Sequence, residues 1–232
     1  QRLTKAFLKD PVKVEVTPPS TTVDKIDQRV LFVDRENKGA LLKSMLEDAT
    51  IERALIFART KHGANKIVKN LSKGKIKADA IHGNKSQAAR LLALNKFKTG
   101  KVRVLVATDI ASRGIDVDGI THVINYELPN EPESYVHRIG RTARAGAAGI
   151  ALSLCDFGEL GYLKKIERAT NKSVVMEKDH IYHSESIASK RNSSSGFKTK
   201  STQKKRFYGK GLSSRKNNKP ATRRGRPQRR RS

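Results

Sequence analysis

Short apolar segments alternate with helical segments along most of the chain, and this alternation constrains the fold more than any other feature. The expected strands are six short apolar runs, at residues 28–33, 54–58, 78–81, 102–107, 122–125 and 150–154. Helical spacing marks residues 38–46, 64–71, 87–97 and 133–139, and the segment 157–169 follows the last strand. Strands that alternate with helices form a parallel sheet covered on both faces. The sequence therefore predicts an α/β fold, with functional residues gathered where the strands end.

The basic charge of the chain is concentrated at its C-terminal end. Residues 190–232 hold seventeen of the 49 Lys and Arg residues and none of the 22 Asp and Glu residues, which leaves a net charge of +10 for the first 189 residues. From about residue 184 the chain has little apolar content, so we expect a folded, mildly basic body followed by a disordered basic tail. This balance predicts a polyanionic partner. Nucleic acid is favoured over a membrane surface, because no amphipathic or long apolar segment accompanies the charge.

Cysteine usage and hydropathy exclude several classes of protein. Cys155 is the only cysteine, which excludes an internal disulfide and argues against a zinc cluster, so we expect it to be a small core residue. No apolar run has the length of a membrane span or a signal peptide, and we therefore expect a cytoplasmic protein.

One histidine and three arginines lie within eight residues, at His137, Arg138, Arg141 and Arg144. If residues 133–139 form a helix, His137 and Arg141 share a face, and Arg141 and Arg144 are three residues apart. Clustered guanidinium groups repel one another, so folding alone would not favour this placement, whereas their planar forks suit a phosphate. The alternative is a solvated basic face.

A second polar stretch begins where the expected strand 102–107 ends. Thr108 and Asp109 follow the strand directly, and Gly114 would permit a tight backbone path between Arg113 and Asp116. Taken alone, a Thr-Asp pair after a strand is also typical of a helix cap.

Together these stretches resemble the DEAD-box RNA helicases. Residues 137–144 resemble motif VI, His-Arg-x-Gly-Arg-x-Gly-Arg, except that Ala143 stands where that family usually has glycine. The resemblance implies that Arg141 and Arg144 meet the γ-phosphate of ATP and stabilise transition-state charge. It also implies that His137 couples the two domains of the enzyme, and we group it with the catalytic residues.

Residues 108–117 resemble motif V of the same family. By that resemblance, Thr108 and Arg113 contact the RNA backbone. Asp116 accepts a hydrogen bond from the nucleotide ribose, and Gly114 belongs to the same ATP-binding loop.

Two weaker motifs agree with this assignment. Residues 55–61 resemble motif IV, and His82-Gly83 followed by residues 86–90 resembles the Gln-x-x-Arg motif. The resemblance implies RNA contacts from Thr60, Gly83, Gln87 and Arg90. For Gln87 and Arg90 the alternatives are a helix-capping pair or a helix N-terminus that meets a phosphate.

The basic tail places aromatic residues beside its charges, with Phe207 and Tyr208 directly after Lys204, Lys205 and Arg206. Bases can stack on such rings while phosphates bind the cations, which predicts RNA binding that is largely independent of sequence. The alternative is a tail that only increases solubility.

The resemblance covers about residues 3 to 175 and looks closest to the bacterial RhlE-like branch. The chain has no Gly-x-x-x-x-Gly-Lys-Ser/Thr phosphate loop and no Asp-Glu-Ala-Asp segment. We therefore expect the phosphate cradle and the Mg²⁺ ligands in an N-terminal RecA-like domain, and no metal site here. Residues 1–22 would be the end of that domain and the linker, 23–178 the C-terminal RecA-like domain, and 179–232 the basic tail.

The sequence thus predicts the C-terminal RecA-like domain of an ATP-dependent RNA helicase. The expected cofactors are ATP and Mg²⁺, and the expected partners are RNA and an N-terminal RecA-like domain in the same polypeptide. We expect a monomer, and we expect the chain to be inactive by itself. The alternative is a non-catalytic RNA-binding or annealing protein that displays a basic tail.

Overall fold

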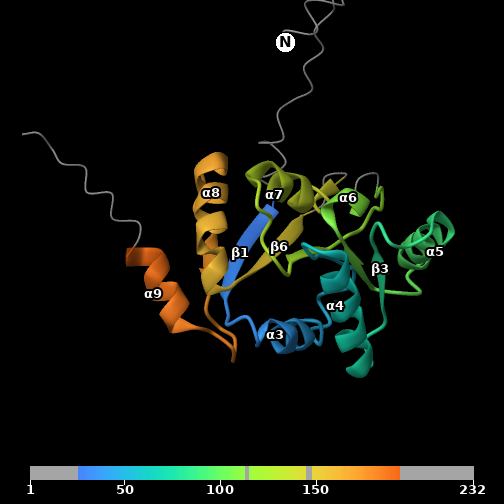
Figure 1. Ribbon diagram of the computed structural model, residues 1–232, viewed down its shortest axis with the longest axis horizontal. Coiled ribbons are helices and arrows are strands. Elements are labelled where there is room, and N and C mark those ends of the chain that lie inside the picture. The colour runs from blue at the N-terminus through green and yellow to red at the C-terminus, as the bar shows by residue number, and fades with distance from the viewer. Residues whose placement is uncertain (1–25, 113–114, 145–147, 194–232) are drawn as a thin grey trace, which may run out of the picture. The chain divides into compact units, whose positions relative to one another are not determined.

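The computed structural model describes residues 26–112, 115–144 and 148–193 (Figure 1), so residues 1–22, the expected domain end and linker, lie outside the described range. Its elements are, in chain order, β1 (Ile26–Phe32), α3 (Lys38–Met45), β2 (Ala54–Phe57), α4 (Lys61–Lys73), β3 (Ala78–Ile81), α5 (Gln87–Lys98), β4 (Val104–Ala107), α6 (Asp109–Ser112), β5 (His122–Asn125), α7 (Pro132–Ile139), β6 (Gly149–Cys155), the 3-10 turn η2 (Phe157–Glu159), α8 (Leu160–Thr170), β7 (Val175–Glu177) and α9 (Glu185–Ser193). The six predicted strands and the predicted helices are confirmed, with ends that shift by a few residues.

The described strands form one parallel sheet in the order β3-β4-β2-β5-β6-β1-β7. The central strands β2 and β4 are buried along their whole length, which explains their unbroken apolar sequences Ala-Leu-Ile-Phe and Val-Leu-Val-Ala. All strands point the same way, so their carboxyl ends share one edge of the sheet, called here the carboxyl edge. The predicted α/β fold is confirmed.

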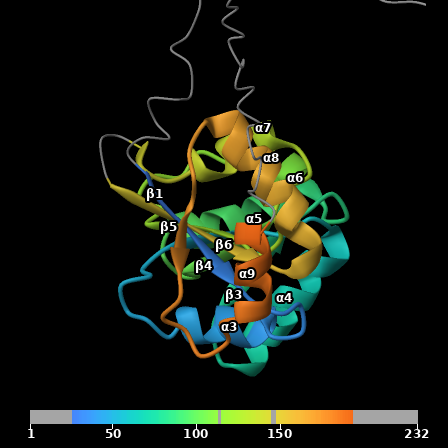
Figure 2. The same ribbon diagram turned by 90° about the vertical axis from the view of Figure 1, so that its left-hand side faces the viewer.

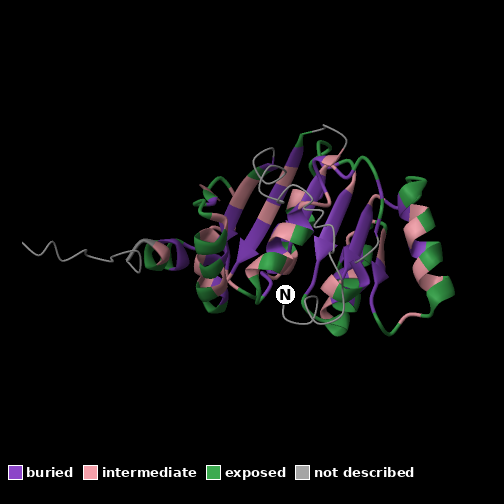
Figure 3. Cartoon of the chain, turned by 90° about the horizontal axis from the view of Figure 1, so that it is seen from above, coloured by how far each residue is buried: buried purple, intermediate pink, exposed green. Residues whose placement is uncertain are grey.

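Helices cover both faces of the sheet (Figures 1 and 2). Alternate residues of β1 show the division, because Leu31 packs with α3 and α4 while Val30 and Phe32 pack with α7, α8 and α9. A third cluster joins α5 and α6 to β2, β3 and β4 on the same face as α7. Figure 3 shows the result, with buried strands between helices whose outer sides are exposed. Cys155 is buried in the second cluster, as predicted.

Helix α4 starts earlier than the spacing of its apolar residues predicts. Ala64, Ile67 and Leu71 form its buried stripe. Its first turn is capped by Thr60, whose Oγ1 accepts a hydrogen bond from the backbone N–H of Gly63 at 3.0 Å. The cap therefore fixes where the chain turns from β2 into α4.

The prediction of disorder from about residue 184 is wrong for residues 184–193, where α9 forms. Ile187 and Ala188 are buried against the sheet, and the guanidinium of Arg191 donates to the carbonyl of Val174 at 2.8 Å and to Glu167. Two apolar residues are too few to predict a helix from composition, and only the packing partners stabilise it. Residues 194–232, including Lys204, Lys205 and Arg206, lie outside the described range.

Candidate functional site

Residues predicted to bind RNA lie along the carboxyl edge. Thr60 follows β2, Gly83 follows β3 and Thr108 follows β4, and these three strands are neighbours in the sheet. A Cβ atom added to Gly83 would meet no atom within 4 Å, so its backbone is open to a ligand. The sheet therefore brings together three predicted contacts that are far apart in the sequence.

Gln87 and Arg90 lie in the first turn of α5, directly after the loop that contains Gly83. The cap of this helix is Ser86, whose Oγ accepts a hydrogen bond from the backbone N–H of Ala89 at 3.3 Å. Capping therefore does not explain Gln87. Its side-chain oxygen instead accepts a hydrogen bond of 3.3 Å from the guanidinium of Arg90.

The Thr108-Asp109 pair lies at the start of α6 and makes a contact that the sequence did not indicate. The carbonyl of Thr108 accepts hydrogen bonds from the N–H groups of Ala111 and Ser112, which begins α6. The carboxylate of Asp109 accepts two hydrogen bonds from Arg138, at 2.6 and 2.8 Å. Arg113 and Gly114, which come next, lie outside the described residues.

Arg138 is a structural residue, and the expectation that folding would not favour the arginine cluster is wrong for it. Its side chain is 1% exposed. Besides Asp109, it donates to Asn125 Oδ1 at 3.2 Å and to the carbonyl of Glu127 at 2.7 Å, and it stacks 5.0 Å from the ring centre of Phe57. Repulsion between arginines is thus offset by the half-exposed carboxylate of Asp109, which the buried guanidinium of Arg138 reaches with two hydrogen bonds.

Arg141 and Arg144 follow α7 and approach the loop that carries Asp116. The guanidinium of Arg141 donates to the carbonyl of Ile115 at 3.2 Å, and that of Arg144 donates to the Asp116 carboxylate at 2.8 Å. Burial, and then the neighbouring Arg144, lower the pKa of Arg141, while Asp116 opposes the shift. The three residues predicted to bind ATP from these two segments therefore form one contact group.

His137 is exposed on α7 and lines a small pocket together with Arg141, Asp109 and Arg138. This pocket has a volume of about 180 Å³. The predicted proximity of His137 and Arg141 is therefore confirmed, although Arg141 lies in the turn after the helix rather than within it.

The turn between the two arginines has unusual backbone geometry. Ala143 has a φ of 54°, in the left-handed region that favours glycine. This position is the one at which the sequence departs from the motif VI pattern, and the structure explains why glycine suits it. Gly149, at the start of β6, packs directly against the turn, since an added Cβ would lie 2.7 Å from the backbone nitrogen of Ala143.

A buried ionic network holds the end of β2 in place, and sequence reasoning missed it. Glu159 accepts hydrogen bonds from Arg59 at 2.9 Å and from Lys38 at 2.5 Å, and Lys38 also pairs with Asp156. Burial raises the pKa of Glu159, while Lys38 opposes that rise. The Asp-x-x-Glu spacing of Asp156 and Glu159 is a capping-box pattern that could have indicated part of the network. Nothing in the sequence indicates Lys38.

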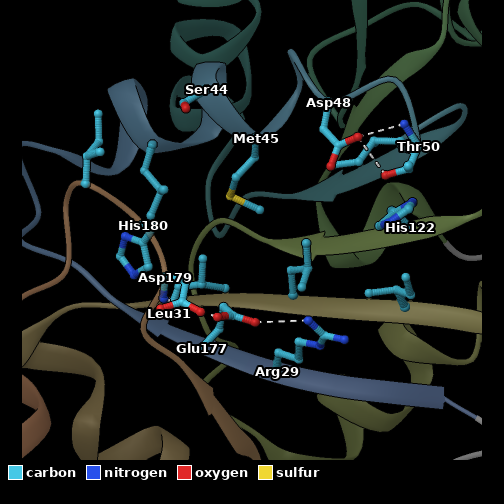
Figure 4. A pocket seen from close by; sticks show the side chains of 15 residues that line it. Arg29, Leu31, Ser44, Met45, Asp48, Thr50, His122, Glu177, Asp179 and His180 are labelled. Carbon is cyan, nitrogen blue, oxygen red and sulfur yellow. Dashed lines mark hydrogen bonds and ion pairs between the residues drawn. The ribbon is translucent and has the colours of Figure 1, made fainter.

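A larger pocket, of about 450 Å³, lies between β1, α3 and the chain after β7, away from the carboxyl edge (Figure 4). Several of its charged side chains already have partners within the pocket lining. Arg29 pairs with Glu177 at 2.9 Å, and Asp48 binds Thr50. None of the residues predicted from the sequence to form the functional site lines it, so we do not assign it to that site.

Within the described ranges, no group of three or more His, Cys, Asp or Glu side chains could hold a metal ion. No described helix is both long enough and apolar enough to cross a bilayer.

Comparisons with known proteins agree on one family. The model of the helicase conserved C-terminal domain matches residues 37–146. The DEAD-box ATP-dependent RNA helicase CshA of Geobacillus kaustophilus is 42% identical over 174 residues, which cover 75% of this chain and 37% of that protein. The chain thus spans little more than a third of the length of this relative.

Two solved structures share the fold. E. coli DEAD-box protein SrmB, bound to regulator of ribonuclease activity A, is 35% identical with a TM-score of 0.63, and the match covers 66% of this chain and 90% of that one. A variant of S. cerevisiae Dbp5 bound to RNA and ADP BeF3 is 28% identical with a TM-score of 0.67, and the match covers 75% of this chain and 46% of that one.

Proposed function

The chain belongs to the DEAD-box proteins, whose helicase C-terminal domain it carries, and from this premise we propose that it supplies half of the ATP and RNA sites of an ATP-dependent RNA helicase. Its fold is the RecA-like α/β fold of that family. The other half of both sites would come from an N-terminal RecA-like domain in the same polypeptide.

The observation that carries the proposal is the contact group of Arg141, Arg144 and Asp116. The guanidinium groups of Arg141 and Arg144, which follow α7, approach the loop that carries the Asp116 carboxylate. In the closed enzyme Asp116 would accept a hydrogen bond from the ribose of ATP. Arg141 and Arg144 would then turn toward the γ-phosphate, where fixed positive charge stabilises phosphoryl transfer. Gly114 would belong to the same loop, and His137 would couple the two domains.

RNA would bind along the carboxyl edge. We assign Thr60, Gly83, Gln87, Arg90, Thr108 and Arg113 to one RNA strand, and Lys204, Lys205 and Arg206 of the tail to further, sequence-independent contacts. The Dbp5 relative bound to RNA and ADP BeF3 supports this pairing of ligands. Closure of the two domains over a bent strand would then separate short duplexes.

The remaining assignments belong to the same proposal. The Mg²⁺ ligands would lie in the N-terminal domain, residues 1–22 would link the two domains, and the enzyme would be a cytoplasmic monomer. We also retain the RhlE-like branch as a proposal, although the Geobacillus kaustophilus relative carries the name CshA.

The proposal is tested by an Arg141→Ala substitution in the protein that includes its N-terminal domain. RNA-stimulated ATP hydrolysis should fall by about three to five orders of magnitude, because a transition-state cation is lost. RNA affinity should stay within about twofold, because Arg141 is not among the RNA contacts. Unchanged hydrolysis would instead favour the non-catalytic RNA-binding protein. The chain by itself should not hydrolyse ATP, and measurable turnover would contradict the idea of a divided site.

A further inference from the structure

The solvent face of α4 carries four lysines and no acidic residue. Lys61, Lys66, Lys69 and Lys73 are all exposed, and the helix contains no Asp or Glu. Its apolar stripe of Ala64, Ile67 and Leu71 packs against the sheet, which forces the lysines outward. At about 100° per residue they lie within an arc of about 140°. We call these four residues the α4 ridge.

The fold balances the charge of the α4 ridge only in part, because Lys66 lines a pocket together with Glu36, Glu127 and Asp156. Among the described residues, no Asp or Glu forms an ion pair with any of the four lysines; Lys61 donates to the side-chain oxygen of Asn84 at 3.0 Å. Lysines three and four residues apart on one helix face repel each other by about 0.2–0.5 kcal/mol per pair. Helix α8 differs, because Glu167 interrupts its basic residues. The α4 ridge therefore slightly destabilises the folded chain and would suit an external polyanion.

The position of the α4 ridge identifies the polyanion. Its helix is capped by Thr60, a proposed RNA contact, and Asn84, the partner of Lys61, is next to Gly83, another proposed contact. From the carboxyl edge, α4 runs back along one face of the sheet (Figure 1). An RNA strand held at that edge would thus meet the α4 ridge where it leaves the proposed site.

The spacing of the lysines also fits a nucleic-acid backbone. Along the helix axis, successive lysines are separated by about 7.5, 4.5 and 6 Å, from a rise of about 1.5 Å per residue. For comparison, each strand of a DNA duplex advances about 3.4 Å per phosphate along the helix axis. The lysines therefore follow one another at intervals of one to two nucleotides.

We propose that the α4 ridge binds the phosphate backbone of RNA that extends beyond the nucleotides held at the carboxyl edge. This inference rests on the proposed function for the path of the RNA. It adds a surface that would anchor long substrates while leaving ATP hydrolysis on short RNA unaffected.

Chemical footprinting of lysines tests the contact directly in the whole chain. The chain is acetylated with an amine-reactive reagent, without RNA, with RNA of about six nucleotides, or with RNA of about 30 nucleotides, and each lysine is quantified by mass spectrometry. Lys66, Lys69 and Lys73 should be protected by the long RNA only. Lys98, Lys101 and Lys165, which are exposed elsewhere, serve as controls and should stay reactive. Equal reactivity of all six lysines with the long RNA would overturn the proposal.

Charge reversal gives an independent test. The variant K66E/K69E/K73E is compared with K98E/K101E/K165E, which changes the net charge by the same amount. In K66E/K69E/K73E only, affinity for the long RNA should fall about tenfold. The slope of log affinity against log salt concentration should also become shallower, by the amount expected for the loss of about two phosphate contacts. The variant K66Q/K69Q/K73Q should lose affinity in the same direction, which guards against misfolding caused by the reversed charges. Equal losses in both reversal variants would overturn the proposal.

The two hypotheses can fail separately. The K66E/K69E/K73E variant, joined to its N-terminal domain, should keep normal ATP hydrolysis stimulated by the short RNA, whereas Arg141→Ala should not. Loss of that hydrolysis in the K66E/K69E/K73E variant would overturn the assignment of the α4 ridge to distal RNA while leaving the proposed function standing.

Discussion

Arg138 holds the carboxylate of Asp109 with two hydrogen bonds of 2.6 and 2.8 Å, across 29 residues of sequence. One partner is buried in α7 and the other begins α6, so this pair fastens the two segments that carry the proposed ATP-binding residues. Its consequences can be measured separately from catalysis.

Arg138→Lys should destabilise the fold. Lysine keeps the charge but lacks the planar fork, so it cannot bind Asp109 by two bonds and also reach Asn125 and the Glu127 carbonyl. The free energy of unfolding should fall by about 2 kcal/mol, because the buried Asn125 oxygen and two partly buried acceptors lose donors. Urea denaturation measures this change. Arg168→Lys on the exposed side of α8 is the matched control. Equal urea midpoints for the two variants would show that the buried Arg138 guanidinium is not needed for stability.

Asp116→Ala should leave stability nearly unchanged and weaken ATP binding. The Arg144–Asp116 pair is at the surface, with 86% of the Asp116 side chain exposed, so its loss should change the free energy of unfolding by at most about 1 kcal/mol. ATP affinity of the protein that includes its N-terminal domain should nevertheless decrease, because the proposed ribose acceptor is gone. Equilibrium binding of a fluorescent ATP analogue measures this. Unchanged ATP affinity would contradict the role given to Asp116.

Gly149→Ala should displace the turn between Arg141 and Arg144. The new Cβ would lie 2.7 Å from the Ala143 nitrogen and would also overlap the side chain of Thr142, so the turn must move. The expected cost is about 1–3 kcal/mol of stability, together with reduced ATP hydrolysis in the protein that includes its N-terminal domain. Gly161→Ala is the control, because its added Cβ meets no atom within 4 Å and it lies in α8, where alanine favours the helix. Similar effects of the two substitutions would refute the steric argument.

Mild acid should weaken the fold through buried histidines. Burial lowers the pKa of both His82 and His122 below the ordinary value of 6.5. Each therefore binds a proton more weakly in the folded state than in the unfolded state. Their contribution to stability is complete above about pH 6.5 and is lost as the pH falls below that value, where the unfolded chain takes up protons.

The expected result is a lower urea midpoint at about pH 5.5 than at about pH 7.5, a window in which ordinary carboxylates do not titrate. His122→Asn should reduce this difference, because it removes one of the two buried imidazoles. A midpoint that does not depend on pH in this window would contradict the burial argument.

Much of this architecture could be predicted from local patterns. The runs around Leu55 and Leu105 are apolar at every position, which is typical of strands buried on both faces, and polar residues such as Thr60 and Thr108 mark where those strands end. Residue spacing also indicated that His137 and Arg141 lie close together, because helical periodicity is a property of a short segment.

Long-range contacts could not be predicted in this way. In the sequence, Arg138 cannot be told from a surface arginine. Its carboxylate partner, Asp109, lies in a distant segment, at the junction of β4 and α6. Lys38 and Glu159 are 121 residues apart and meet only because β1, β5 and β6 lie close together in the sheet. Helix α9 was missed for the same reason, since Ile187 and Ala188 acquire their packing partners only in the folded chain.

The sequence by itself therefore determined the parallel α/β class, the family motifs and the edge of the sheet at which they gather. Those features follow from the period of side chains along a segment and from backbone preferences of single residues. Only the tertiary structure decided which arginine is buried and which approach Asp116, because burial and charge pairing depend on which strands become neighbours. That choice is set by contacts between residues distant in sequence, which no local window contains.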